Sequence, residues 1–209
     1  MKINEIFYSI QGEGNWTGLP NIFIRTSGCN LRCSYCDTKY AYDTFKEIKI
    51  IKIIDEIRKY NCKKVCITGG EPLLQKDMIK LVDELIKNNY NVSIETNGSI
   101  EIEPISNKKL VMISLDVKCP SSNMAEKMLY QNLLYLKKKD QLKFIIGDIK
   151  DYSFAKAIII NNKIGCSIFF QPVAGTDPRK LANWIIKDNL NVKLGLQIQK
   201  ILWQNRRGT

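Results

Sequence analysis

Hydrophobic positions along the chain follow two alternating patterns. Short runs rich in Val, Ile and Phe predict strands, and longer segments with apolar residues three or four positions apart predict helices. The predicted strands lie near residues 21–27, 63–68, 91–95, 110–115, 141–146, 167–171 and 192–198. The predicted helices lie near residues 48–60, 76–89, 121–139, 151–162 and 178–188. Strands that alternate with helices predict an α/β fold with a mainly parallel sheet.

Polar motifs follow these predicted strands at their carboxyl ends. In chain order they are GCNLRCSYC, TGGEP, ETNG, DVKCP and QPVAG. Because the carboxyl ends of parallel strands meet at one edge of the sheet, we expect an active site there. A complete eight-unit barrel typically takes about 250 residues, and this chain has 209. We therefore expect a partial (incomplete) TIM-like barrel in a single domain that covers residues 1–209.

Charge and hydropathy narrow the classes of partner. The formal net charge is +11, from 32 Lys and Arg against 21 Asp and Glu. A basic chain can bind nucleic acid, but these lysines are scattered over predicted helices, which is typical of solvated faces. We therefore expect no nucleic-acid partner, and the charge also suits an acidic electron donor. No signal peptide and no apolar run of about 18 residues is visible, so we expect a cytoplasmic protein without a membrane segment.

Cysteine spacing supplies the first candidate chemistry. The chain has seven cysteines and no histidine, which excludes the usual Ser-His-Asp and Cys-His machinery. Cys29, Cys33 and Cys36 form a C-x3-C-x2-C pattern on one predicted loop. A closed iron–sulfur cluster uses four cysteines, so three thiolates leave one iron open to a ligand. A zinc site would need a fourth ligand, and the remaining cysteines lie in or beside predicted strands, where they are interpreted as buried thiols.

The cysteine pattern and the GGEP motif of Gly69–Pro72 together resemble the radical S-adenosylmethionine (SAM) superfamily. Further motifs resemble one family within it, 7-carboxy-7-deazaguanine synthase: SIQGEG, FIRTSGCNLRCSYCDT, TGGEPLLQ, ETNGS, SLDVKCPSS, LKFIIGD, QPVAG and a closing LQ-x-x-K-x-x-W. The resemblance covers nearly the whole chain. It implies a partial barrel of the radical SAM type. It also implies conversion of 6-carboxy-5,6,7,8-tetrahydropterin to 7-carboxy-7-deazaguanine with loss of ammonia, using a 4Fe–4S cluster, SAM and Mg²⁺.

The resemblance also implies roles for individual residues. The 4Fe–4S cluster is expected on the three cysteines of the motif, Cys29, Cys33 and Cys36. SAM is expected to contact Tyr35, Cys36, Asp37, Gly70, Asp116, Val117, Lys118, Gln171, Pro172, Val173 and Ala174. The pterin is expected to contact Ile10, Gln11, Gly12, Glu13, Arg25, Thr68 and Gln199.

Three residues carry more specific expectations, namely Arg25, Thr38 and Gln199. The guanidinium of Arg25 can pair with the substrate carboxylate through two parallel hydrogen bonds. The hydroxyl of Thr38 is expected to bind Mg²⁺, and the substrate must complete this weak site. Gln199 stands where the resembled family has histidine. Because glutamine cannot titrate near neutral pH, we interpret Gln199 as a residue that only positions the pterin.

Other activities stay open at the level of sequence. They are another radical SAM enzyme, such as a glycyl-radical activating enzyme, a basic RNA-binding iron–sulfur protein, and a redox iron–sulfur protein without SAM chemistry. The short chain and the SIQGEG segment favour a small-molecule pterin pocket over a site that admits a protein segment. The resemblance further suggests a homodimer, and an acidic electron donor such as flavodoxin or ferredoxin would suit the basic surface.

Overall fold

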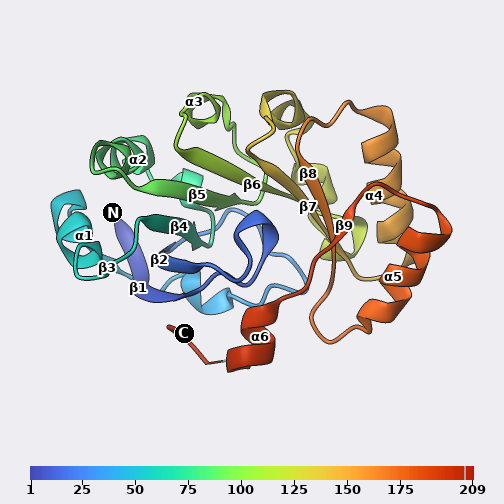
Figure 1. Cartoon of the computed structure of the whole chain (residues 1–209), viewed down its shortest axis with the longest axis horizontal. Helices are drawn as coiled ribbons and strands as arrows, with labels where there is room; N and C mark the ends of the chain where they lie inside the picture. The colour runs from blue at the N-terminus through green and yellow to red at the C-terminus, as the bar shows by residue number, and fades with distance from the viewer. Residues whose placement is uncertain (205) are drawn as a thin grey trace.

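The computed structural model describes residues 1–204 and 206–209. One curved nine-stranded sheet runs through it in the order β3-β1-β2-β4-β5-β6-β7-β8-β9 (Figure 1). The strands are β1 (Lys2–Ile10), β2 (Pro20–Thr26), β3 (Lys46–Glu47), β4 (Lys64–Gly69), β5 (Asn91–Thr96), β6 (Val111–Val117), β7 (Gln141–Ile146), β8 (Ser167–Pro172) and β9 (Lys193–Leu194). The strands from β2 through β4 to β9 are parallel, whereas β1 pairs antiparallel with both β2 and β3.

Helices follow most of the parallel strands and cover the outer face of the sheet (Figure 1). They are α1 (Ile50–Ile57), α2 (Met78–Lys87), α3 (Glu103–Ser106), α4 (Ile149–Asn161), α5 (Pro178–Lys187) and, near the C-terminus, α6 (Ile198–Trp203). The strand order begins at β3 and ends at β9, so the sheet of the described residues stays open. The prediction of an incomplete α/β barrel with a mainly parallel sheet is confirmed. Within the described residues, none of the helices has the length and apolarity needed to cross a bilayer.

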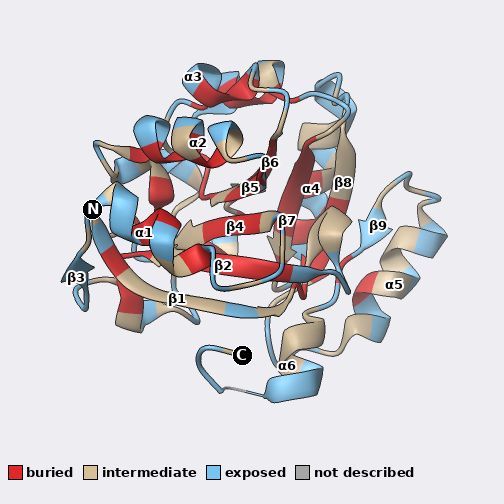
Figure 2. Cartoon of the chain, turned by 60° about the vertical axis from the view of Figure 1, so that its left-hand side comes forward, coloured by how far each residue is buried: buried red, intermediate tan, exposed pale blue. Residues whose placement is uncertain are grey.

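The central strands have two different faces. Their outward side chains, such as Ile94, Leu115 and Phe144, are almost fully buried under the helices, and the strands form the buried centre of the molecule (Figure 2). Burial of each such side chain contributes about 1.5–3 kcal/mol. The inward side chains at alternating positions are largely polar and line a cavity, as Glu95 and Lys143 do. The period of two along a strand therefore separates the stabilising core from the candidate site.

The helix predicted at 121–139 is wrong. The chain instead forms 3₁₀ turns at Pro120–Ser122, Ala125–Lys127 and Tyr130–Tyr135. The side chain of Ser122 donates to the carbonyl of Cys119 at 2.6 Å, and buried Asn132 bonds to the backbone of residues 98–102. The Ser122 bond is local and competes with a regular helix, whereas the Asn132 bonds join this segment to a loop about 30 residues away in sequence.

The two edges of the sheet also differ from the sequence prediction. At one edge, the predicted strands include neither β3 nor its neighbour β1. At the other edge, β9 is limited to Lys193–Leu194, and the predicted strand 192–198 is too long. The amide of Gly195 still donates to the carbonyl of Phe170 at 2.8 Å. Beyond it the chain turns towards the cavity and begins α6 at Ile198.

A buried carboxylate in the first turn of α4 holds several loops together. Asp151 is fully buried and accepts hydrogen bonds from the amide of Gly147 at 2.8 Å and the amide of Ser121 at 2.9 Å. The hydroxyl of Ser121 also donates to it. The carbonyl of Ser121 accepts from the hydroxyl of Ser34 at 2.6 Å, on the cysteine-bearing loop. Asp151 thus links α4, the loop after β6 and the cysteine loop.

Replacement of Asp151 by alanine is expected to lower the free energy of unfolding by about 3 kcal/mol, because buried donors lose their acceptor. Urea unfolding of the reduced, metal-free protein, followed by circular dichroism, measures the change. Asp55→Ala is the control, since the Asp55 side chain is 46% exposed and its loss should cost below about 0.5 kcal/mol. Equal stability of the two variants would contradict this role of Asp151.

Candidate active site

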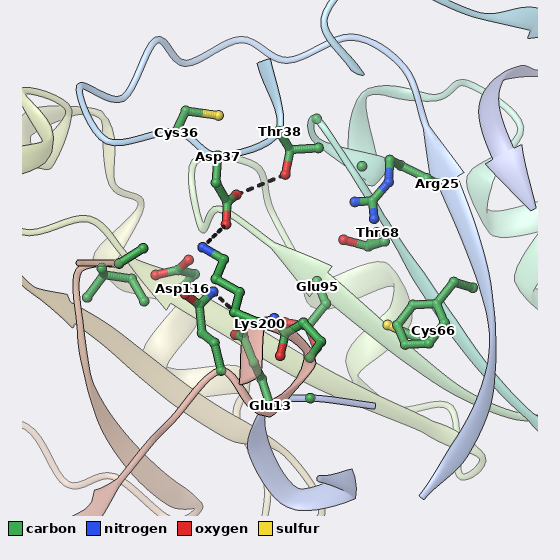
Figure 3. Close-up of a pocket in the computed structure, with 18 of the residues that line it drawn as sticks. Glu13, Arg25, Cys36, Asp37, Thr38, Cys66, Thr68, Glu95, Asp116 and Lys200 are labelled. Atoms are coloured by element: carbon green, nitrogen blue, oxygen red, sulfur yellow. Dashed lines mark hydrogen bonds and ion pairs between the residues drawn. The ribbon is translucent and has the colours of Figure 1, made fainter. Parts of the chain in front are cut away.

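A cavity of about 550 Å³ lies inside the curve of the sheet, at the carboxyl ends of the parallel strands. Its size falls within the usual range of small-molecule sites. Figure 3 places Cys36, Asp37 and Thr38 on one side of it and Glu13 and Glu95 on the opposite side. The cavity is therefore lined by residues from the cysteine loop, from several strands and from the segment that follows β1.

The cysteine loop follows β2 and docks against the end of β4. The amide of Glu71 donates to the carbonyl of Gly28 at 2.8 Å. A Cβ atom on Gly70 would lie 2.1 Å from the Gly28 carbonyl oxygen, so only glycine fits at this approach. Gly28 itself has a positive φ of 94°. The backbone of the GGEP motif therefore holds the cysteine loop in position.

Three thiols of this loop line the cavity. Cys29, Cys33 and Cys36 are free and partly exposed. Burial raises the pKa of the Cys29 and Cys33 thiols, so bound iron would be needed to hold them as thiolates. Among the described residues, no three Cys, Asp or Glu side chains converge on a point for a single metal ion. A cubane cluster does not require such convergence, because each thiolate binds a different iron. The loop fits that cluster.

A fully buried carboxylate anchors the loops around the thiols. Glu71 accepts hydrogen bonds from the Leu73 amide at 3.0 Å, the Thr96 hydroxyl at 2.9 Å and the Asn97 amide at 2.7 Å. Burial raises its pKa to about 6, although these hydrogen bonds act in the opposite direction. The side-chain amide nitrogen of Asn97 in turn lies 3.8 Å from the Cys29 sulfur. Hydrogen bonds of this kind tune the potential of an iron–sulfur cluster.

The segment after β1 folds onto the inner face of the sheet. Its turn is closed by hydrogen bonds between Gln11 and both Gly18 and Leu19, each at 2.8 Å. The amide of Asn15 donates to the side chain of Gln141 at 2.6 Å. This fold carries Glu13 into the cavity, where its carboxylate lies 3.1 Å from the Lys143 ammonium.

Buried ion pairs dominate the floor of the cavity. The Lys143 ammonium also lies 2.9 Å from Glu95, and the Glu13 carboxylate accepts hydrogen bonds from Gln197 at 2.7 Å and Gln199 at 3.0 Å. Burial by itself would raise the pKa of the Glu13 carboxyl. The Lys143 charge and the hydrogen bonds from the two amides outweigh burial and lower this pKa from 4.5 to about 2. Burial likewise acts to lower the pKa of Lys143, and the carboxylates of Glu95, Glu13 and Asp116 raise it well above its usual value.

Further ion pairs hold the walls of the cavity. Arg25 pairs with Glu5 at 2.7 Å, and Lys118 pairs with Asp116 at the same distance. At the mouth, Lys200 of α6 pairs with Asp37 at 2.8 Å (Figure 3). These contacts fix the side chains before any ligand arrives, as a preorganised site requires.

Besides Glu95 Oε2, which lies 2.9 Å from the Lys143 ammonium, four cavity-lining residues carry buried polar atoms without a hydrogen-bond partner among the described residues. They are the Tyr35 hydroxyl, Asp116 Oδ1, Gln171 Oε1 and Gln199 Oε1. Buried polar groups in folded proteins are normally satisfied. Acceptors and a hydroxyl aimed into a cavity therefore suit a polar ligand that supplies the missing partners.

Comparison with known proteins shows the family to which this chain belongs. A family profile described as "Radical SAM superfamily" matches residues 23–158. The 7-carboxy-7-deazaguanine synthase of Thermoplasma acidophilum is 42% identical over 97% of both chains. The protein of the same name from Methanospirillum hungatei is 41% identical over 97% of this chain and 85% of its own. The chain belongs to the 7-carboxy-7-deazaguanine synthase family.

A solved structure agrees with this membership. The crystal structure of QueE from Escherichia coli superimposes with a TM-score of 0.78 at 27% identity, covering 94% of this chain and 93% of the other. The incomplete barrel is thus of the radical SAM type. Membership in the 7-carboxy-7-deazaguanine synthase family makes this chain a radical SAM lyase of 7-deazapurine biosynthesis, with a 4Fe–4S cluster and SAM as its cofactors.

The cavity brings together nearly every residue that the sequence analysis assigned to the site. All of them line it except Val117, whose side chain is buried in the core beside Leu115. Val117 lies at an outward position of β6, between the inward residues Asp116 and Lys118. Any contact from Val117 to SAM would therefore use its backbone. The individual roles stay predictions.

Several residues that line the cavity were missed by the sequence analysis, and two of them contact Glu13. Lys143 and Gln197 bond directly to Glu13 and line the cavity. The sequence carries a signal for Lys143, since it is a charged residue inside the otherwise apolar strand LKFII, and buried lysines are nearly always paired. The sequence carries no such signal for Gln197. This residue falls inside the strand predicted at 192–198, and that prediction does not determine which face of the sheet carries its side chain.

Replacement of Glu13 by glutamine is expected to lower stability in a pH-dependent way. Its folded pKa of about 2 lies below the value of 4.5 for the unfolded chain. The ionised group therefore stabilises the fold at pH above about 4.5, and this contribution is lost as the pH falls towards 2. Urea unfolding of wild type and Glu13→Gln between pH 6 and pH 3 measures it.

The difference between the two proteins should be largest above pH 5 and should shrink towards pH 3. Glu101→Gln is the matched control, since Glu101 is exposed, and its difference from wild type should stay small and constant. A Glu13 difference that does not change with pH would contradict the assigned ion pair.

Proposed function

We propose that this chain converts 6-carboxy-5,6,7,8-tetrahydropterin to 7-carboxy-7-deazaguanine with loss of ammonia. The observation that carries the proposal is a family-wide resemblance joined to a polar cavity beside three free thiols. Carboxylates at the floor can accept from the N–H-rich edge of a pterin, and Arg25 at the wall can receive its carboxylate. We further propose that residues 1–209 act as one domain.

Cys29, Cys33 and Cys36 are proposed to hold the cluster. When bound, the reduced cluster and SAM together supply the radical that starts the ring contraction. The protein's part is to hold both ligands, exclude water and fix their relative position. The close backbone contact between Gly28 and Gly70 supports this role, because it fixes the loop that carries the thiols.

SAM is proposed to lie along the carboxyl ends of β4, β6 and β8. Asp116 Oδ1 and the Gln171 side-chain oxygen are buried acceptors that lack a partner among the described residues. Both suit hydroxyl or amino donors of a nucleoside and an amino acid. Tyr35, next to the cluster ligand Cys36, contributes a buried hydroxyl of the same kind.

The pterin is proposed to occupy the side of the cavity formed by β1, β2 and the segment after β1. Ile10, Gln11 and Gly12 line this side, as does Thr68 of β4. Arg25 pairs with Glu5, and its guanidinium lies 5.7 Å from the centre of the Tyr40 ring. These contacts hold the guanidinium in place and leave other N–H groups for a substrate carboxylate.

Mg²⁺ is proposed to bind at Thr38. Its hydroxyl donates to the Asp37 carboxylate at 2.9 Å, so a hard oxygen pair lies at the cavity wall. Other expectations from the sequence stay predictions alongside it. They are a homodimer, an acidic electron donor such as flavodoxin or ferredoxin, and a cytoplasmic location.

The activity is tested with protein reconstituted anaerobically with iron and sulfide. Incubation with SAM, Mg²⁺, a reductant and carboxytetrahydropterin should form 7-carboxy-7-deazaguanine, identified by absorbance and mass. Cys33→Ser should abolish the product and lower the bound iron. Cys62→Ser is the matched control, because Cys62 does not line the cavity, and it should keep both.

Two outcomes would separate the proposal from its alternatives. Reductive cleavage of SAM without any deazaguanine product would mean a different radical SAM activity, such as glycyl-radical activation. Neither SAM cleavage nor product, with a full cluster bound, would leave a redox iron–sulfur protein.

Replacement of Gln199 by histidine is expected to leave turnover broadly unchanged. Gln199 donates to Glu13 and packs against Gly12, where an added Cβ would lie 1.7 Å from its side-chain oxygen. The residue is thus held as a positioning group, and glutamine cannot titrate near neutral pH. Steady-state rates between pH 6 and 8.5 measure the effect. A rate gain of tenfold or more would mean that a titrating group is missing from this chain.

A further inference from the structure

Lys143 is a buried cation that no assigned role in the site uses. It lies in the middle of β7 with 5% of its surface exposed. Its ammonium is 3.1 Å from Glu13 and 2.9 Å from Glu95. The two carboxylates come from the segment after β1 and from β5, so one ammonium joins three elements that are far apart in sequence.

The groups that face this ammonium come from every neighbouring strand. Asp116 of β6 and Lys118, which directly follows β6, pair with each other at 2.7 Å, and the Cys66 thiol of β4 is neutral because burial raises its pKa to about 12. From β8 the neighbouring cavity residue is the uncharged Gln171. The charge balance at the floor therefore rests on Glu13, Glu95 and Lys143, which together carry one net negative charge.

Without Lys143, two carboxylates would share the floor of the cavity with no cation between them. Each lies within 3.1 Å of the same nitrogen atom, so they are close to each other. Like charges at such distances repel each other, and this repulsion favours uptake of a proton by one of the two groups. The state of the floor would then depend on pH.

Glu13 transmits the position of Lys143 to the C-terminal segment. One carboxylate oxygen of Glu13 faces Lys143, and the other accepts from Gln197 at 2.7 Å and Gln199 at 3.0 Å. The amide of Ile198 donates to the carbonyl of Gly12 in the same region. Displacement of Glu13 would therefore remove the side-chain hydrogen bonds that hold Gln197 and Gln199 in the cavity.

We propose that Lys143 is a positioning residue of the pterin site: its ammonium holds the carboxylates of Glu13 and Glu95 in place, and through Glu13 it holds the C-terminal segment against the cavity. The proposal rests on the proposed function, because the pterin is the ligand that this arrangement serves. Lys143 acts as a fixed charge and not as a proton donor, since the surrounding carboxylates keep it protonated.

The test is binding of 6-carboxypterin, the oxidised fluorescent relative of the substrate, to the reconstituted holoenzyme. Equilibrium dialysis at pH 5.5, 6.5 and 7.5 measures the dissociation constant of each variant relative to wild type at the same pH. The variants are Lys143→Met, Lys143→Arg and the double variant Lys143→Met with Glu13→Gln. Lys156→Met is the matched control, because Lys156 pairs with Asp188 between α4 and α5.

Lys143→Met is expected to bind at least tenfold more weakly than wild type at pH 7.5. The gap should narrow towards pH 5.5, where one carboxylate takes up a proton and the repulsion is relieved. Lys143→Arg should stay within threefold of wild type. The double variant restores one net negative charge, so the ratio of its dissociation constants at pH 7.5 and pH 5.5 should return to that of wild type, while loss of the Glu13 acceptor weakens binding at every pH. Lys156→Met should match wild type.

Two outcomes would overturn the inference while the proposed function stands. They are equal binding by wild type and Lys143→Met, and a loss of affinity that is the same at every pH, as a merely structural lysine would give. Wild type that does not bind the pterin at all would overturn the proposed function and this inference with it. Should Lys143→Met not fold, Lys143→Gln takes its place in every comparison.

Discussion

The contact between the cysteine loop and the end of β4 holds the candidate site together. The Glu71 amide bonds to the Gly28 carbonyl, and Gly70 lies too close to that carbonyl for any side chain. The Glu71 carboxylate then binds the end of β5 through Thr96 and the Asn97 amide. Since these links use backbone groups or a fully buried side chain, the thiols cannot shift without breaking several of them. Three loops that are distant in sequence thus become one rigid rim.

The two faces of the central strands divide the work of stability and of chemistry. Outward residues such as Ile113 and Phe144 are fully buried under helices and supply the apolar burial that stabilises the fold. Inward residues such as Glu95 and Lys143 bring charges into a confined space, which costs free energy unless the charges are paired. The apolar burial on the outer face therefore offsets the free-energy cost of the charges on the inner face. A polar cavity of this kind needs the complete layer of helices behind it.

Local patterns predicted what depends on neighbouring residues. The parallel strands as far as β8, the cysteine triad and the GGEP turn follow from hydrophobic period, spacing and glycine placement and fall where expected, whereas β9 is shorter than predicted. The helix predicted at 121–139 failed because Asn132 bonds to loop residues 98–102, which no local pattern reveals. Lys143 was missed because its partner Glu13 lies 130 residues away. Pairing across the inner face of a sheet depends on how the strands are ordered, and a single sequence does not fix that order.

Fixed charges distinguish this site from one built for proton transfer by side chains. The chain has no histidine, and Glu13 and Lys143 are held in their charged forms by each other and by their neighbours. Glu71 has a pKa of about 6, but its oxygens are occupied by three donors and it has no exposed surface. Such a cavity suits a reaction in which hydrogen moves chiefly as an atom.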